Sequence, residues 1–129
     1  MNPLQLQRLY ALALCVWREA RGETPIGQLL VAQTVENRVH DPRWPDTYAG
    51  VILQRLQFSA FNAGDANALL FPNETDQSWA VAVAVAEAVI ASPAPFTAAN
   101  HYHTRGVSPG WRDDSAIVNR EGSHIFYRL

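Results

Sequence analysis

Cysteine, lysine and long apolar runs are scarce or absent in this sequence of 129 residues. Its single cysteine, Cys15, excludes an internal disulfide framework. Its ten basic residues are all arginine. No run reaches the roughly 18–20 uncharged apolar residues of a membrane-spanning helix, because Glu87 interrupts the longest candidate, Trp79–Ala91. We therefore expect no stable insertion into a membrane.

The balance of charge and hydrophobicity indicates a folded chain without a strongly charged partner. Hydrophobic residues make up 48% and charged residues 17% of the chain, which excludes wholesale disorder. The net charge of −2 provides no strong attraction to nucleic acid, so none is expected as a partner. The length is that of one domain, which we place at residues 1–129 and expect to be monomeric.

The apolar segment near the N-terminus is interpreted as a core helix. Leu9–Trp17 follows the single basic residue Arg8, whereas a signal peptide has a more strongly positive start and small residues before its cleavage site. Leu14, directly before Cys15, also departs from a lipoprotein cleavage site. We expect no signal peptide.

Apolar periodicity and capping residues predict a mainly helical fold. The predicted helices are residues 4–20, a second from the Thr24 cap and Pro25 to about His40, residues 47–56, and a fourth from caps at 73–75 to about Ala91. The segment 58–72 is predicted to be mostly loop. Alanine and valine alternate over residues 80–86 with the period of a strand, but both are apolar. The high alanine content of this run favours a buried helix. Segments 99–104 and 117–127 indicate short extended pieces that cover the helical body.

Two carboxylates flank the predicted end of the first helix. Glu19 follows an apolar segment containing Trp17, so its carboxyl group is a candidate for partial desolvation. Desolvation raises the pKa of a carboxyl group, and a general acid at neutral pH needs a raised pKa. Glu23 lies four residues later. The alternative interpretation is a solvated Glu/Arg cluster on the surface.

Three further groups of residues carry polar or aromatic chemistry. Gln57, Phe58 and Ser59 combine an amide, a ring and a hydroxyl group, which suit a sugar, although a plain loop is the default for such a tripeptide. The run His101-Tyr102-His103 would place both histidines on one face of a strand. The candidate metal ligands are His101, His103, His124 and Cys15, but their spacing matches no zinc pattern, so the site is predicted to hold no metal.

The order of several short motifs resembles one known family. In chain order these are Glu19-Ala20-Arg21-Gly22-Glu23, Gly27-Gln28, Val31-Ala32-Gln33, Asn37-Arg38-Val39, Asp41-Pro42-Arg43, Pro45, Gly50-Val51-Ile52, Gln57-Phe58-Ser59, His101-Tyr102-His103, Pro109, Trp111, and Gly122 to Arg128. Together they resemble the SleB-type cell-wall hydrolases, known from spore-cortex-lytic enzymes and related bacterial and phage proteins. The resemblance runs from about Cys15 to Arg128 and is carried by the order of the motifs. Segment 62–75 shows no feature of the family.

This resemblance implies a compact, mainly α (α+β) fold, similar to lysozyme and lytic transglycosylases, with a small β or irregular lobe. It also implies cleavage of the bond between N-acetylmuramic acid and N-acetylglucosamine in bacterial peptidoglycan, without a cofactor. Glu19 matches the catalytic carboxyl of the family. The expected substrate-binding residues are Glu23, Gln57, Phe58, Ser59, Tyr102, His103 and Trp111. The alternative for Glu23 is that it only braces the turn, through Arg21 or Arg18.

Several functions remain open beside a lytic transglycosylase. They are a muramidase that uses water and a second carboxylate, a metal-dependent wall amidase built on His101, His103 and His124, and a peptidoglycan-binding protein without catalysis. A small catalytic domain equally suits a gene-transfer particle, a bacterial wall-remodelling enzyme exported by another route, or a phage endolysin. Such an endolysin would accumulate in the host cytoplasm and then act in the periplasm or cell wall.

Overall fold

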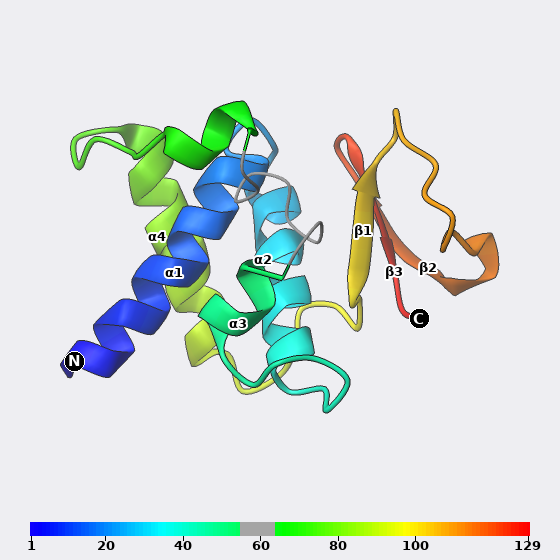
Figure 1. Cartoon of the computed structure of the whole chain (residues 1–129), viewed down its shortest axis with the longest axis horizontal. Helices are drawn as coiled ribbons and strands as arrows, with labels where there is room; N and C mark the ends of the chain where they lie inside the picture. Colours follow the sequence, from blue (N-terminus) through cyan, green and yellow to red (C-terminus); the bar gives the residue numbers. More distant parts are fainter. Residues whose placement is uncertain (55–63) are drawn as a thin grey trace.

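The computed structural model shows a helical body with a small antiparallel sheet beside it (Figure 1). The structure describes residues 1–54 and 64–129. Its elements are α1 (Pro3–Ala20), α2 (Pro25–Val39), α3 (Tyr48–Ile52), the 3-10 helix η2 (Ala66–Leu69), α4 (Gln77–Ala91), β1 (His101–Thr104), the 3-10 helix η3 (Asp114–Ala116), β2 (Ile117–Glu121) and β3 (His124–Tyr127). The predicted class, mainly α with a small β lobe, is confirmed.

Local capping explains where the two long helices begin. Asn2 accepts a hydrogen bond from the backbone N–H of Gln5, whose side chain accepts one from Asn2 in return, so α1 begins with a capping box. Thr24 accepts from the backbone N–H of Gly27, and Pro25 occupies the first turn of α2. Both predicted helices are confirmed, with α2 ending at Val39.

The third and fourth helices differ from their predicted bounds. Helix α3 is confined to Tyr48–Ile52 within the predicted range 47–56, the end of which lies outside the described residues. Helix α4 begins after Asp76, later than the predicted caps at 73–75, because residues 73–76 form a separate turn. In this turn the Asn73 side chain accepts a hydrogen bond from the backbone N–H of Thr75, and the Asp76 side chain accepts one from the backbone N–H of Asn73. The alternating segment 80–86 is helical, as predicted, and its buried side chains pack against α1 and α2.

The sheet has the strand order β1-β3-β2, with both pairs antiparallel and a bulge in β2. Phe126 of β3 is fully buried and packs against a group of apolar residues from α1, α2 and the segment before β1. These are Ala20, Leu30, Val31 and Ala99. The Phe126 face of the sheet is therefore the face toward the helical body.

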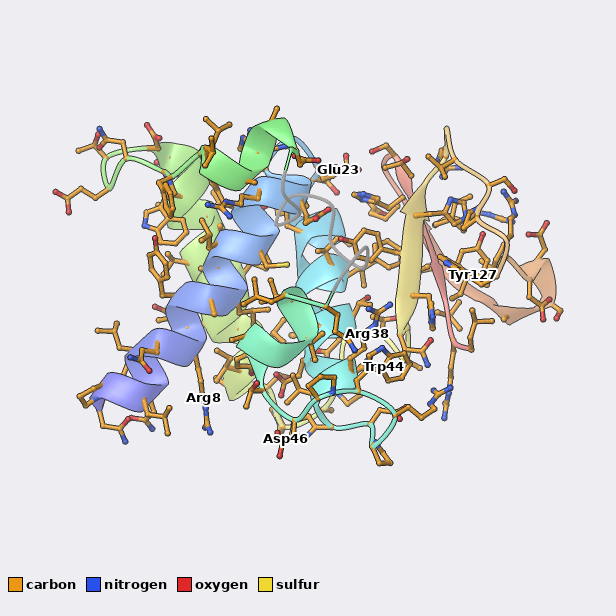
Figure 2. The ribbon with its side chains drawn as sticks, viewed as in Figure 1. Arg8, Glu23, Arg38, Trp44, Asp46 and Tyr127 are labelled. Carbon is orange, nitrogen blue, oxygen red and sulfur yellow. The ribbon has the colours of Figure 1, made fainter. Side chains whose placement is uncertain are left out.

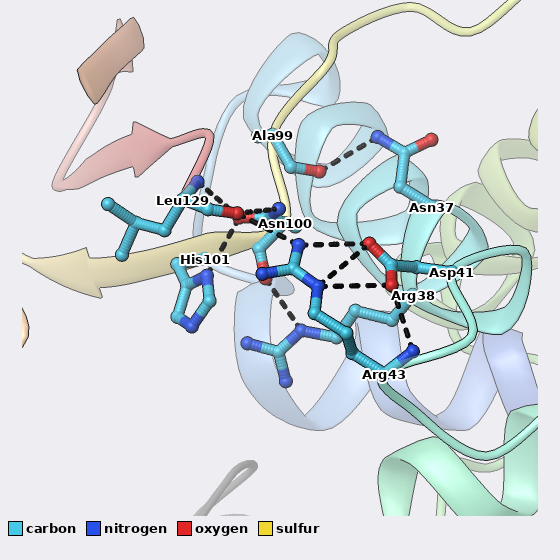
Figure 3. Close-up of polar contacts among 8 residues, drawn as sticks. All are labelled: Asn37, Arg38, Asp41, Arg43, Ala99, Asn100, His101 and Leu129. Carbon is cyan, nitrogen blue, oxygen red and sulfur yellow. Dashed lines mark hydrogen bonds and ion pairs between the residues drawn. The ribbon is translucent and has the colours of Figure 1, made fainter.

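The Asn37-Arg38 motif joins the end of α2 to the entrance of β1 (Figure 3). The Asn37 amide donates hydrogen bonds to the carbonyl oxygens of Thr97 and Ala99, at 2.9 and 2.8 Å. The Nε of Arg38 donates to the carbonyl oxygen of Asn100 at 2.6 Å. Each bond satisfies a backbone acceptor in a buried or partly buried position, so the motif fixes where β1 starts relative to α2.

Within the described residues, every helix is too short or too polar to cross a bilayer.

Candidate active site

The Glu19 carboxylate lies where the last turn of α1 meets the sheet. Glu19 is half-buried, and its Oε2 accepts a hydrogen bond from the Tyr102 hydroxyl of β1 at 3.3 Å. The two residues are 83 positions apart in the chain, so the packing of the sheet on the helical body creates this pair. The structure thus brings together two of the predicted site residues.

Tyr102 is kept in its protonated form. Burial raises the pKa of its phenol well above the usual value, and the negative charge of Glu19 raises it further. A neutral phenol can donate to the carboxylate at any pH near neutrality. Tyr102 can therefore hold the Glu19 side chain in one orientation.

Cys15 of α1 and Arg38 of α2 are buried near the Glu19–Tyr102 pair. Burial raises the pKa of the Cys15 thiol, as does the nearby Glu19 charge, so Cys15 remains a neutral, buried side chain. The guanidinium of Arg38 is almost completely buried and lies over the Trp44 ring, with its carbon 5.1 Å from the ring centroid. Burial lowers the pKa of Arg38 to about 10, so it remains a cation at neutral pH.

Glu23 follows α1 and faces the turn between β2 and β3 (Figure 2). Its Oε1 accepts hydrogen bonds from the backbone N–H of Ser123, at 3.1 Å, and from the Ser123 hydroxyl. The same oxygen lies 2.9 Å from Nδ1 of His124, at ion-pair distance but without hydrogen-bond geometry. Burial lowers the pKa of His124, and the Glu23 charge opposes that shift. Glu23 thus contacts the hairpin, and its predicted contact with substrate stays a prediction.

His103 and Trp111 lie on the face of the sheet opposite Tyr102. The His103 ring stacks on Tyr127, and its Nε2 is 2.6 Å from the Tyr127 hydroxyl. The Trp111 ring meets His103 and Tyr127 edge-on, at centroid distances of 5.7 and 5.3 Å. Figure 2 shows Tyr127 on the side of the sheet away from the helices. The structure therefore does not bring His103 and Trp111 to Glu19, and their predicted roles stay predictions.

The candidate metal ligands do not converge. His101 and His103 share one face of β1, as predicted, whereas the His124 ring contacts Tyr102 on the opposite face. Cys15 is buried in the helical core. No group of three or more His, Cys, Asp or Glu residues within 1–54 and 64–129 could hold a metal ion. Gln57, Phe58 and Ser59 lie outside the described residues.

His101 is expected to make the protein less stable in mild acid. Burial, with help from the charges of Arg38 and Arg43, lowers its pKa to about 4 from 6.5. Between these values the unfolded chain binds a proton that the folded protein does not, so stability falls as the pH falls from about 6.5 to 4. Urea unfolding at several pH values should show this fall, and His101→Gln should reduce it. An equal fall in wild type and variant would contradict this assignment.

Two residues of the site belong to the motifs that carry the family resemblance but were not predicted to be site residues. Arg38 follows Val31 and Val35 at helical spacing, so a charged residue continues the apolar, buried face of α2. This spacing in the sequence could have predicted that Arg38 is buried. Phe126 packs beneath Tyr102 at a centroid distance of 5.7 Å. Its position depends on the pairing of β1 with β3, which no local pattern in the sequence specifies.

Comparison with solved structures supports the same fold. The catalytic domain of the germination-specific lytic transglycosylase SleB from Bacillus anthracis matches with a TM-score of 0.76 and 27% identity, over 98% of both chains. The catalytic domain of the Bacillus cereus SleB protein matches with a TM-score of 0.70 and 27% identity, over 95% of this chain and 90% of that one.

Sequence comparisons identify relatives and a family. Spore cortex-lytic enzymes from Halalkalibacterium halodurans and Bacillus subtilis are each 32% identical, over 97% and 89% of this chain. The chain covers 34% and 35% of those proteins, so it spans about a third of their length. Residues 22–127 match the family model described as Cell Wall Hydrolase. Because that model matches most of the sequence, the chain belongs to the Cell Wall Hydrolase family.

Proposed function

We propose that this chain degrades peptidoglycan by cleaving the bond between N-acetylmuramic acid and N-acetylglucosamine, with Glu19 as general acid and then general base. The observation that carries the proposal is the half-buried Glu19 carboxyl, held by the buried Tyr102 hydroxyl where the helical body meets the sheet. The similarity to a lytic transglycosylase catalytic domain supports it.

The reaction needs one carboxyl group, which is used twice. Protonated Glu19 gives its proton to the glycosidic oxygen as the bond from that oxygen to C1 of the muramic ring breaks. The C6 hydroxyl of the same ring then forms a bond to C1, and its proton returns to Glu19. The products are a free N-acetylglucosamine 4-hydroxyl and a 1,6-anhydromuramic end, and the enzyme is regenerated.

The position of Glu23 favours this route over hydrolysis with Glu23 as the second group. A glycosidase that uses water places two carboxyl groups on either side of the scissile bond. Glu23 instead contacts Ser123 and His124, and its side chain is only 14% exposed. The water-using alternative would therefore have to break these contacts or recruit another carboxylate.

Removing the Tyr102 hydroxyl is expected to slow the reaction without unfolding the protein. Tyr102→Phe keeps the ring against Phe126 but removes the hydrogen bond to Glu19. Glu19 becomes charged as it gives its proton to the glycosidic oxygen, so the Tyr102 hydrogen bond strengthens as the glycosidic bond breaks. A hydrogen bond to a charged group contributes about 1.5 kcal/mol or more, so we expect a rate lower by about tenfold. The measurement is the initial rate of fragment release from purified peptidoglycan. An unchanged rate would show that Tyr102 does not orient Glu19.

The test of the proposed function is digestion of purified peptidoglycan, with analysis of the soluble material. We expect disaccharide fragments that retain their peptide stems, in the presence or absence of a metal chelator. Release of free stem peptides that stops on addition of chelator would instead indicate the histidine-based amidase. Binding of the protein without release of any fragment would indicate the non-catalytic alternative.

We also propose that the chain acts on the wall as a phage endolysin, reaching it from the host cytoplasm. Expression in a bacterial host with a membrane pore should cause lysis, and expression without the pore should not. Lysis without the pore would contradict this route.

A further inference from the structure

Glu23 and His124 lie behind Tyr102, on the side of the sheet that faces the helical body. We propose that Glu23 is a positioning residue that holds Tyr102 against Glu19 through His124. The inference rests on the proposed function, because it concerns how that site is kept in order. It gives the second glutamate of the Glu19-to-Glu23 motif a role distinct from that of a second catalytic carboxylate.

The turn between β2 and β3 is built around the Glu23 carboxylate. One oxygen, Oε1, contacts the backbone N–H and the hydroxyl of Ser123 and lies 2.9 Å from Nδ1 of His124. Gly122 has a φ of +56°, and a Cβ at this position would lie only 3.1 Å from Oε2 of Glu23. Glycine thus permits both the turn and the close approach of the carboxylate.

His124 transmits this contact to Tyr102. Its side chain is 4% exposed, and its ring meets the Tyr102 ring edge-on at a centroid distance of 5.0 Å. Phe126 supports the same Tyr102 ring at 5.7 Å. A shift of the buried His124 ring therefore changes the packing of Tyr102, and a small displacement lengthens the 3.3 Å hydrogen bond to Glu19.

The chain offers a matched control for the loss of Glu23. Glu121, at the end of β2, accepts a hydrogen bond at 3.0 Å from the hydroxyl of Thr24, the residue after Glu23. Glu121 therefore joins the same two segments of the chain, but through Thr24 rather than through His124. Glu121→Gln removes a comparable charge from the same region.

The test is a double-mutant cycle between Glu23→Gln and Tyr102→Phe, read as the rate of fragment release at saturating peptidoglycan. We expect each single variant to lose about tenfold in rate, and Glu121→Gln to retain the wild-type rate. The double variant should be no slower than Tyr102→Phe alone, because the hydroxyl that Glu23 positions is already absent. If Glu23 contributed independently of the Tyr102 hydroxyl, the two rate losses would multiply, and the double variant would lose about a hundredfold in rate.

A second measurement does not depend on catalysis. NMR spectra should show shifted ring signals of Tyr102 in Glu23→Gln, relative to wild type, and unshifted signals in Glu121→Gln. Should Glu23→Gln fail to fold, Ser123→Ala takes its place in both measurements, with a rate loss of about threefold expected from the loss of one hydrogen bond.

The outcomes separate this inference from the proposed function. A wild type that releases no glycan fragments overturns the proposed function, and the inference with it. An active wild type combined with multiplicative rate losses, an unaffected Glu23→Gln variant or unshifted Tyr102 signals overturns the inference alone.

Discussion

Glu19→Gln is expected to lower the rate of fragment release from peptidoglycan by about 10²- to 10⁴-fold, the usual contribution of a general acid. Glutamine keeps the size of the side chain and an oxygen that can accept the hydrogen bond from Tyr102, but its amide has no acidic proton to give to the glycosidic oxygen. The loss should therefore affect catalysis and leave the fold intact. The measurement is the initial rate of release, together with a thermal unfolding curve for each protein.

The control for this variant is Glu87→Gln, which removes an exposed carboxylate from α4. Its rate should equal that of the wild type. A Glu19→Gln variant that retains more than about a tenth of the wild-type rate would contradict the assignment of Glu19 as the acid.

The largest expected effect on stability comes from Phe126→Ala. This side chain is fully buried against α1 and α2, so its truncation should leave a cavity and lower the free energy of unfolding by about 3–5 kcal/mol. The cavity would also remove the support beneath Tyr102. Urea unfolding measures the loss, and the rate of the folded fraction should fall as well.

Phe126→Leu provides the comparison, because leucine refills most of the cavity. We expect it to cost about 1.5 kcal/mol or less. If Phe126→Ala costs no more than Phe126→Leu, the sheet is not anchored on the helical body by this residue.

The helical part of the fold could be predicted from the sequence because its signals are local. The apolar spacing of residues 4–20 and the Thr24-Pro25 start of α2 each depend on neighbours within one or two turns. The start of α4 was predicted too early because Asn73, one of the predicted caps at 73–75, accepts a hydrogen bond from the backbone N–H of Thr75 in a turn that precedes the helix. Short polar side chains offer such alternatives, and the sequence does not reveal which one forms.

The arrangement of the histidines was only partly predictable. Alternation along a strand correctly placed His101 and His103 on one face. The face that His124 occupies depends on the pairing of β3 with β1 and β2 and on a bulge in β2, so it could not be derived from spacing.

The contacts that build the site join residues far apart in the chain. Ser123 and Glu23 are 100 positions apart, and Tyr102 and Glu19 are 83 apart. All four residues stand in motifs that carry the family resemblance. Which of them contact each other could not be predicted from those motifs, because the contacts form only when the sheet packs on the helical body. The expected monomer and the single domain over residues 1–129 stay predictions.

The most direct test of the account is mass spectrometry of glycan fragments released in water enriched in the heavy oxygen isotope. A lytic transglycosylase that uses Glu19 alone should yield 1,6-anhydromuramic ends, which are one water lighter than hydrolysed ends and carry no heavy oxygen. Reducing muramic ends that carry the heavy isotope would show that water attacks C1, and would contradict the single-carboxyl mechanism.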